Sequence, residues 1–384
     1  MSWQSSQAFK PYEGLYGRTP LEQSRPLAAM TAAVLAASQK PVVEEALRQL
    51  HTQLDSIPSD INWFEFQHGV ARLGMAPRAA KQRRYTPLSS SGRATLYEAG
   101  GDGPPVVLIP SMVNRGYILD LHPGHSLVEA LIAQGYRVLL MDWGEPASPL
   151  TLETIISAHL EPLLRHAAGL YGPVAAFGYC MGGLLALAAA VRLGPDIVGR
   201  LALAAMPWDF SPTASATHMH HGRTILEPWL ASQSVLPPSV LAHYFWMLDP
   251  WGPIRRIIAY GKETDPQRLA YLTALEDWLA DGLALDAPIA REMLFDWYAD
   301  NRTLKGNWQV GGTAITPKTL RIPLWVAITQ NDVLVPTACS LPFIGQATGS
   351  LQVHMAQAGH VGLVCGRRAA EQLYTPLGNW LKHR

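Results

Sequence analysis

The run Val174-Ala-Ala-Phe-Gly-Tyr-Cys-Met-Gly-Gly183 constrains the fold of this chain more than any other segment. An apolar stretch typical of a buried strand leads into Gly-x-Cys-x-Gly, and the helix-forming stretch 184–190 follows directly. A reactive side chain on so sharp a turn between a strand and a helix needs glycines around it, because the backbone is strained there and added side chains would crowd it. The position where a serine is expected holds Cys180, and a thiolate is a strong nucleophile that exchanges readily with thioesters.

Further apolar segments alternate with helical spacing along residues 86–384. A helix is expected over 126–134, and strands over 93–98, 105–110, 136–142, 174–177, 201–205, 323–328 and 351–354. Strands that alternate with helices predict an α/β fold with a mostly parallel sheet, and the strand–turn–helix elbow makes it an α/β-hydrolase fold. Between 207 and 315 helical stretches rich in Trp and Tyr replace the strand signals, so we predict a helical cap insertion over the carboxyl edge of the sheet.

Residues 1–85 carry helical patterns and no strand signal, so we predict a helical N-terminal region separate from the catalytic domain. The stretches 26–38 and 41–54 have the clearest helical composition and spacing. The chain then breaks at a proline, after which Ser59 or Asp60 is expected to cap the next helix.

Charge and cysteine content limit the partners and the setting of the chain. Thirty basic and thirty acidic residues balance, so no nucleic-acid partner is expected. The three cysteines are odd in number and fit no metal or disulfide spacing, which favours a reducing, cytoplasmic setting. The first residues do not form a signal peptide, and the apolar stretch 27–37 is too short for a transmembrane segment. The 12 Trp fit an apolar binding face or an aromatic core equally well.

Two polar residues follow predicted strands in the order that the elbow requires. Asp332 comes just after the strand 323–328, and His360 comes just after the strand 351–354. The carboxyl ends of parallel strands meet at the edge of the sheet where ligands sit. A cysteine nucleophile needs a base, and the base needs an orienting acid. We therefore predict a catalytic triad of Cys180, His360 and Asp332.

An oxyanion formed at a thioester carbonyl needs two backbone donors. One is expected to be the N–H of Met181, directly after the nucleophile. The other is expected from the loop 111–114, with Val113 as the first choice. The positive N-terminal end of the elbow helix would in addition favour a thiolate at Cys180.

Other candidate residues receive plainer interpretations. Cys339 and Cys365 lack the elbow context and are predicted to be structural. The histidines of 217–221 have no carboxylate or cysteine at a ligand spacing, so we predict no metal site. His122 and His125 lie near the oxyanion loop and are expected to line the entrance.

Beyond these residues, the chain resembles the polyhydroxyalkanoate synthase family over about 105–384. The double glycine after Met181 and the Asn-Arg loop make the resemblance specific, and chain length is most similar to the class III catalytic subunit. The segments that carry it are Pro110-Ser-Met-Val-Asn-Arg-Gly-Tyr-Ile-Leu-Asp-Leu121, Met141-Asp-Trp-Gly144, Gly178-Tyr-Cys-Met-Gly-Gly183, Pro207-Trp-Asp-Phe210, Trp297-Tyr-Ala-Asp-Asn-Arg-Thr-Leu-Lys-Gly306, 332–336 and 359–362.

The resemblance implies an acyltransferase that polymerises (3R)-hydroxyacyl-coenzyme A thioesters and releases coenzyme A. Cys180 would carry the acyl group, and His360 would handle the protons. Coenzyme A enters as part of the substrate, so no cofactor is expected. The resemblance also implies partners: a polyester chain or granule surface, a second synthase subunit, and a second copy in a homodimer.

Two other functions are compatible with the same sequence features. A thioesterase or intracellular polyester depolymerase of this fold would need the same triad, with water as the acceptor in place of a hydroxyl. A non-catalytic granule-associated or partner subunit would retain the fold without needing the triad, and the complete Cys–His–Asp set argues against it.

Overall fold

The computed structural model describes residues 58–78, 85–249 and 251–382. The chain divides into two compact units. Of the described residues, the smaller contains 58–78, 224–229, 237–249 and 251–282, and the larger contains 85–223, 230–236 and 283–382. The expected helices 26–38 and 41–54 lie outside the described residues.

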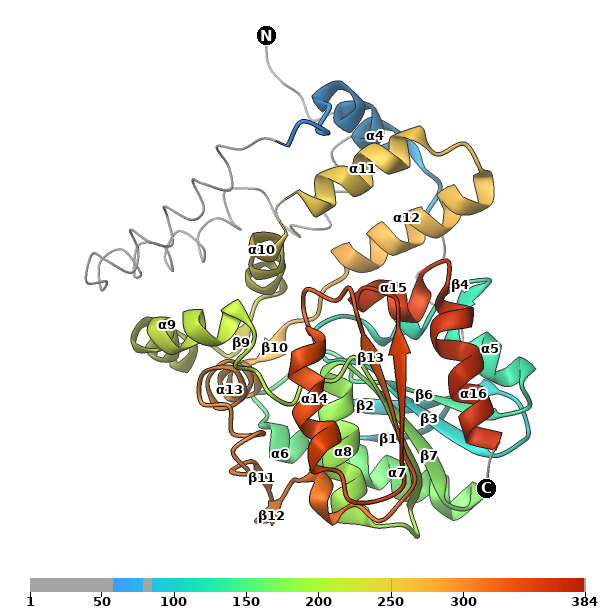
Figure 1. Ribbon diagram of the computed structural model, residues 1–384, viewed down its shortest axis with the longest axis vertical. Helices are drawn as coiled ribbons and strands as arrows, with labels where there is room; N and C mark the ends of the chain where they lie inside the picture. Colours follow the sequence, from blue (N-terminus) through green and yellow to red (C-terminus); the bar gives the residue numbers. More distant parts are fainter. Residues whose placement is uncertain (1–57, 79–84, 250, 383–384) are drawn as a thin grey trace. The chain divides into compact units, whose positions relative to one another are not determined.

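The larger unit is built on one eight-stranded sheet with the order β1-β2-β6-β3-β7-β8-β13-β14 (Figure 1). β1 pairs antiparallel with β2 and β2 antiparallel with β6, whereas β6, β3, β7, β8, β13 and β14 run parallel to one another. The strands are β1 Thr86–Ser91, β2 Ala94–Gly100, β3 Pro105–Ile109, β6 Arg137–Asp142, β7 Val174–Tyr179, β8 Val198–Ala204, β13 Leu324–Thr329 and β14 Leu351–Ala356. This mostly parallel sheet confirms the predicted α/β-hydrolase fold.

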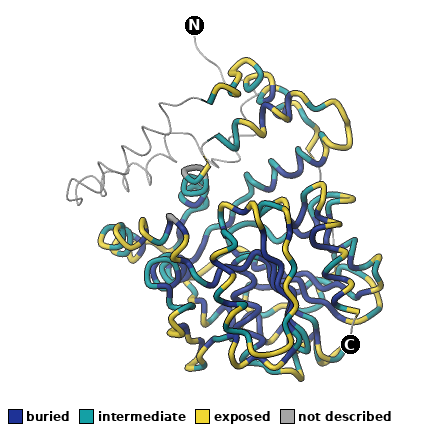
Figure 2. The backbone as a smooth tube through the Cα atoms, viewed as in Figure 1, coloured by how far each residue is buried: buried dark blue, intermediate teal, exposed yellow. Residues whose placement is uncertain are grey.

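Helices connect the parallel strands and cover the sheet. They are α5 Leu127–Ala133, α7 Glu161–Tyr171, α8 Met181–Leu193, α14 Thr337–Gln346, α15 His360–Cys365 and α16 Thr375–Lys382. The helix α8 is buried from Met181 to Ala190, as a helix that is apolar all round must be. The buried backbone in Figure 2 accordingly runs through the sheet and α8, which places the start of α8 in a rigid part of the molecule.

Each strand that the sequence predicts is present, but β1 was missed. Its residues Thr-Pro-Leu-Ser-Ser-Ser are mostly exposed or half-buried, and the strand lies at the edge of the sheet. An edge strand needs no apolar alternation and tolerates proline, so its sequence looks like a loop.

The segment 207–315 is largely helical, as expected. It contains α9 Ala214–Ala231, α10 Pro238–Leu248, α11 Gly252–Lys262, α12 Pro266–Ala280 and α13 Ala287–Arg291, with the short pairs β9 Val235–Leu236 with β10 Leu285–Asp286 and β11 Gln309–Val310 with β12 Thr313–Ala314. Its parts fall into both compact units. The division into an N-terminal region, a catalytic domain and a cap therefore stays a prediction. Among the described residues no helix is long and apolar enough to span a bilayer.

In the smaller unit, helix α4 (Trp63–Met75) packs against α11 around Leu73, Ile257 and Tyr260. The prediction of its N-cap was wrong, because the side chain of Asn62 accepts the N–H groups of Phe64 and Glu65. A capping side chain must lie directly before the first helical turn, and the helix begins later than the break at Pro58 suggested.

The crossing of α4 and α11 depends on Gly69. A Cβ atom built there would lie 2.2 Å from the backbone oxygen of Ile257. The substitution Gly69→Ala should therefore lower the free energy of unfolding by about 1–3 kcal/mol, as overpacking does. Chemical denaturation of the parent and of Gly69→Ala measures this difference in the free energy of unfolding.

Gly169 in α7 provides the matched control, since nothing lies within 4 Å of a Cβ built there. Gly169→Ala should leave stability unchanged or raise it by about 0.5–1 kcal/mol, because alanine favours helices. Equal effects of the two substitutions would contradict the crossing described here.

Candidate active site

Cys180 lies on the turn between β7 and α8 with φ 55° and ψ −126°. A positive φ is rare for a residue with a side chain and is found where the surroundings enforce it. Here the N–H of Cys180 donates to the carbonyl of Ala204 at 2.9 Å, and its own carbonyl accepts from Gly183 at 2.9 Å. The predicted elbow is therefore present, held by β8 on one side and by the first turn of α8 on the other.

The glycines of the elbow are required by close backbone approach. A Cβ at Gly178 would lie 2.5 Å from the Cα of Gly183. A Cβ at Gly182 would lie 2.3 Å from the carbonyl oxygen of Ile109 and 2.4 Å from that of Pro110. No side chain fits at these distances, so the start of α8 rests directly on the end of β3.

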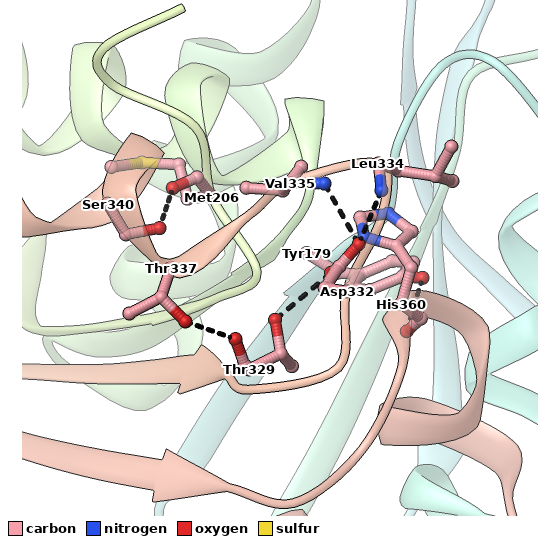
Figure 3. Close-up of polar contacts among 9 residues, drawn as sticks. All are labelled: Tyr179, Met206, Thr329, Asp332, Leu334, Val335, Thr337, Ser340 and His360. Carbon is pink, nitrogen blue, oxygen red and sulfur yellow. Dashed lines mark hydrogen bonds and ion pairs between the residues drawn. The ribbon is translucent and has the colours of Figure 1, made fainter. Parts of the chain in front are cut away.

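Asp332 is held in one orientation by four donors (Figure 3). Its Oδ1 accepts the backbone N–H groups of Leu334 and Val335, both at 2.9 Å. Its Oδ2 accepts the hydroxyl of Thr329 at 3.0 Å and the ring of His360 at 2.7 Å. The side chain is fully buried. A buried carboxylate with both oxygens hydrogen-bonded keeps its charge and fixes the ring that it faces.

His360 is the first residue of α15 and follows β14, as predicted. Its Nδ1 bonds Asp332, which leaves Nε2 for the nucleophile. The ring lies against that of Tyr179, with centroids 5.2 Å apart, and the hydroxyl of Tyr179 donates to the His360 carbonyl at 3.1 Å. The structure thus brings Cys180, Asp332 and His360 to the carboxyl ends of β7, β13 and β14, respectively.

The charges of neighbouring groups shift the pKa values of His360 and Asp332. Burial alone lowers the pKa of His360, but the negative charges of Cys180 and Asp332 and its hydrogen bonds to both raise that pKa to about 10. Burial raises the pKa of Asp332, and the charge and hydrogen bond of His360, with the donors Val335 and Thr329, lower it overall. The site therefore favours a charged imidazolium at His360, beside the carboxylate of Asp332, at neutral pH.

The two expected oxyanion donors differ in their present bonding. Met181 is the first residue of α8, so its N–H has no acceptor within the helix. The N–H of Val113 donates to the hydroxyl of Ser111 at 3.2 Å, while its carbonyl accepts the N–H of Leu283 at 3.3 Å. For Val113 to serve as a donor, the Ser111 hydroxyl must first rotate away. The oxyanion assignment stays a prediction.

The Asp-Trp-Gly turn supports this loop. The indole N–H of Trp143 donates to the carbonyl of Pro110 at 3.0 Å, and Asp142 accepts the N–H of Gly144 at 2.9 Å. Arg115 of the Asn-Arg loop forms an ion pair with Glu145, directly after the turn. These motif residues therefore fix the loop after β3 and do not belong to the reacting group.

The segments 207–210 and 297–306 are joined by hydrogen bonds. The amide of Asn301 donates to Asp209 at 2.7 Å and accepts the backbone N–H of Phe210 at 3.2 Å, while Thr303 donates to the carbonyl of Trp208. Asn301 has a positive φ of 51°. Sequence reasoning recognised both segments as family motifs and missed this mutual support, because the pairing joins residues about ninety positions apart.

The remaining cysteines and histidines considered in the sequence lie on other elements. Cys339 and Cys365 are buried, and burial raises the pKa of Cys339 to about 12, which keeps its thiol protonated. His122 and His125 lie on the hairpin β4 (Asp120–His122) and β5 (His125–Ser126), where His125 bonds the carbonyl of Cys365 at 2.8 Å. The histidines of 217–221 lie on α9.

The sheet order and the elbow define an α/β-hydrolase fold with cysteine at the nucleophile position. No family model matches the chain. It is 25% identical over 291 residues to the poly(3-hydroxyalkanoate) polymerase subunit PhaC of Haloferax mediterranei, a match that covers 73% of this chain and 59% of that subunit. The corresponding subunits of Allochromatium vinosum and Synechocystis are 25% and 26% identical, with 73% of this chain and 81% and 78% of theirs covered.

The predicted resemblance is therefore confirmed: the chain is a homologue of proteins named poly(3-hydroxyalkanoate) polymerase subunits. It spans about three fifths of the Haloferax relative's length. Similar solved structures include an esterase from Thermogutta terrifontis, 18% identical with a TM-score of 0.46, covering 79% of this chain and 98% of that one. A monoacylglycerol lipase from Paleococcus ferrophilus is 15% identical, with a TM-score of 0.45 and coverages of 74% and 98%.

The coupling of the three side chains can be measured directly. In the intact protein His360 should titrate near pH 10, by NMR of its imidazole carbons. Cys180→Ala removes a Coulombic and hydrogen-bond partner that raises the pKa of His360, so it should lower this pKa. An unchanged value in Cys180→Ala would show that the sulfur does not face the ring.

The raised pKa of His360 also makes the stability of the folded protein depend on pH. A pKa raised on folding stabilises the folded state fully below the ordinary value of 6.5 and loses that contribution as pH rises through about 10. The free energy of unfolding should therefore fall over this window, and fall less in Cys180→Ala. Denaturation at a series of pH values measures both slopes.

Proposed function

We propose that this chain is an acyltransferase that polymerises (3R)-hydroxyacyl-coenzyme A into polyhydroxyalkanoate with release of coenzyme A. The observation that carries the proposal is a cysteine on a strained elbow, coupled to the buried His360–Asp332 pair, in a homologue of polyhydroxyalkanoate polymerases. A protected thiolate–imidazolium pair is suited to attack on a thioester.

In the first half-reaction the Cys180 thiolate attacks the carbonyl carbon of the substrate thioester. The tetrahedral intermediate collapses with cleavage of the bond to the coenzyme A sulfur, and His360 returns its proton to that leaving thiolate. Free coenzyme A departs, and the hydroxyacyl group stays on Cys180 as a thioester. One thioester replaces another, so this step is nearly balanced in energy.

In the second half-reaction a 3-hydroxyl group is the acceptor. His360, now neutral, takes the hydroxyl proton as the oxygen attacks the Cys180 thioester. An ester bond forms, the bond to sulfur breaks, and the thiolate–imidazolium pair is restored. A serine ester would release its acyl group less readily, which explains the use of cysteine.

Asp332 orients the ring and stabilises its charged form throughout. Its four donors and full burial prevent it from turning toward any other group. The proposed cycle requires no cofactor, since coenzyme A is part of the substrate. The proposed partners are the growing polyester or its granule surface and a second synthase subunit, as in the relatives named as polymerase subunits.

The parent chain should release free thiol from 3-hydroxybutyryl-coenzyme A, measured with a thiol reagent. Cys180→Ala and Cys180→Ser should lose that release. Asp332→Asn should lower the rate by about 10²- to 10⁴-fold, because the ring loses its orienting charge.

Cys339→Ala is the matched control, since it removes a buried thiol on α14 and leaves Cys180 in place, and it should retain the activity of the parent. Full activity in Cys180→Ala would end the proposal. A Cys180 that does not react with an alkylating reagent at neutral pH would instead favour a non-catalytic subunit.

Product size separates a polymerase from a hydrolase with the same triad. The proposal expects insoluble polyester in amounts that account for the coenzyme A released, measured by chromatography after methanolysis. Free 3-hydroxybutyrate in place of polymer would identify water as the acceptor and the chain as a thioesterase.

A further inference from the structure

The helix α15, which begins with His360, has only six residues. A helix this short is not stable by itself, so contacts with the rest of the fold set its position. Two side chains hold its end. The hydroxyl of Tyr374 donates to the carbonyl of Val364 at 2.5 Å, and the ring of His125 bonds the carbonyl of Cys365 at 2.8 Å. Both bonds lie at the far end of the helix from the base, so the start of α15 needs an anchor of its own.

Tyr179 provides a contact at the start of α15 (Figure 3). Its hydroxyl donates to the carbonyl of His360 at 3.1 Å, and its ring packs against the imidazole with centroids 5.2 Å apart. One side chain therefore holds both the backbone and the ring of the base. Tyr179 is 3% exposed, so water does not readily replace the hydrogen bond if the hydroxyl is removed.

The position of Tyr179 in the chain links this contact to the nucleophile. Tyr179 is the last residue of β7, and Cys180 follows it directly on the elbow. The bond from Tyr179 to His360 therefore joins the base to the residue next to the nucleophile. Asp332 holds the Nδ1 atom of the same ring from the loop after β13. The base thus has two separate anchors, one beside the elbow and one on the loop that carries the acid.

The hydroxyl of Tyr179 acts as a hydrogen-bond donor and not as an acid or base. Burial raises the pKa of Tyr179 well above its ordinary value, and Coulombic interactions with Cys180, Asp332 and Cys365 raise it further. The hydroxyl therefore stays protonated over the pH range in which His360 titrates, and its bond to the His360 carbonyl persists across that range.

We propose that Tyr179 is a positioning residue, whose hydroxyl and ring keep the imidazole of His360 directed toward Cys180. The displacement of a reacting group by about 1 Å can cost about 10²-fold in rate, so a second anchor on the base has a direct effect on catalysis. The inference concerns the site of the proposed acyl transfer and applies to a hydroxyl or to water as the acceptor.

The titration of His360 in the intact protein tests the proposal. Tyr179→Phe keeps the ring and removes the hydroxyl. Cys180 and Asp332 raise the pKa of His360, and such effects weaken as the groups move apart. Tyr179→Phe should therefore lower the pKa of His360 by about half a unit to one unit, measured by NMR of its imidazole carbons.

Tyr136→Phe is the matched control, since it also removes a buried tyrosine hydroxyl that donates to a backbone carbonyl, that of Gly378 at 2.8 Å. Both substitutions should lower the free energy of unfolding by similar amounts, but Tyr136→Phe should leave the pKa of His360 unchanged. The comparison separates a role in positioning the base from a general role in folding.

The rate at which iodoacetamide modifies Cys180 tests whether Tyr179 acts through His360. Mass spectrometry of the peptide that contains Cys180 follows the reaction. Tyr179→Phe should slow it about 3- to 10-fold, as expected for the loss of one hydrogen bond. In a His360→Ala background the same substitution should change nothing, because the base that Tyr179 positions is absent.

Neither measurement uses a substrate, so the outcome does not depend on whether the chain is a polymerase. An unchanged pKa of His360 in Tyr179→Phe would overturn the proposal. So would an equal shift of that pKa in Tyr136→Phe, or equal slowing of the alkylation by Tyr179→Phe with and without His360.

Discussion

The contact between the start of α8 and the end of β3 is the constraint on which the site depends. Gly182 lies so close to the carbonyls of Ile109 and Pro110 that no Cβ fits between them. This contact joins the first turn of α8 to the end of β3, and Cys180, directly before that turn, has a positive φ of 55°. The elbow that carries Cys180 and the loop after β3 are therefore held close together.

Several of the sequence motifs hold the loops around this contact in place. Trp143 holds the loop after β3 through the Pro110 carbonyl, and Asn301 bonds Asp209 in the segment after β8. Asp332 is in turn held by Thr329 and two backbone N–H groups. Residues whose side chains bond other parts of the chain thus account for several of the motifs, because precise placement of a few side chains needs many fixed neighbours.

Sequence patterns predicted the elements whose residues form a local apolar run, and they missed the elements that have no such run. Buried parallel strands are continuous apolar runs, so β3, β7 and β13 could be predicted with nearly correct ends. The polar edge strand β1 has no such run and was missed. The cap of α4 was assigned to Ser59 or Asp60 and is Asn62, since the break at Pro58 does not fix where the helix begins.

The sequence by itself determined the α/β fold and the elbow, and it singled out Cys180, Asp332 and His360 as candidates, because strand periodicity, glycine spacing and the order of these residues can be read along the chain. Only the tertiary structure decided how these residues act on one another. The 2.7 Å contact of His360 with Asp332 and the raised pKa of His360 depend on burial and on charges brought together from distant segments. The bond between Val113 and Ser111 and the bond between Tyr179 and His360 likewise depend on three-dimensional neighbours, which no local pattern encodes.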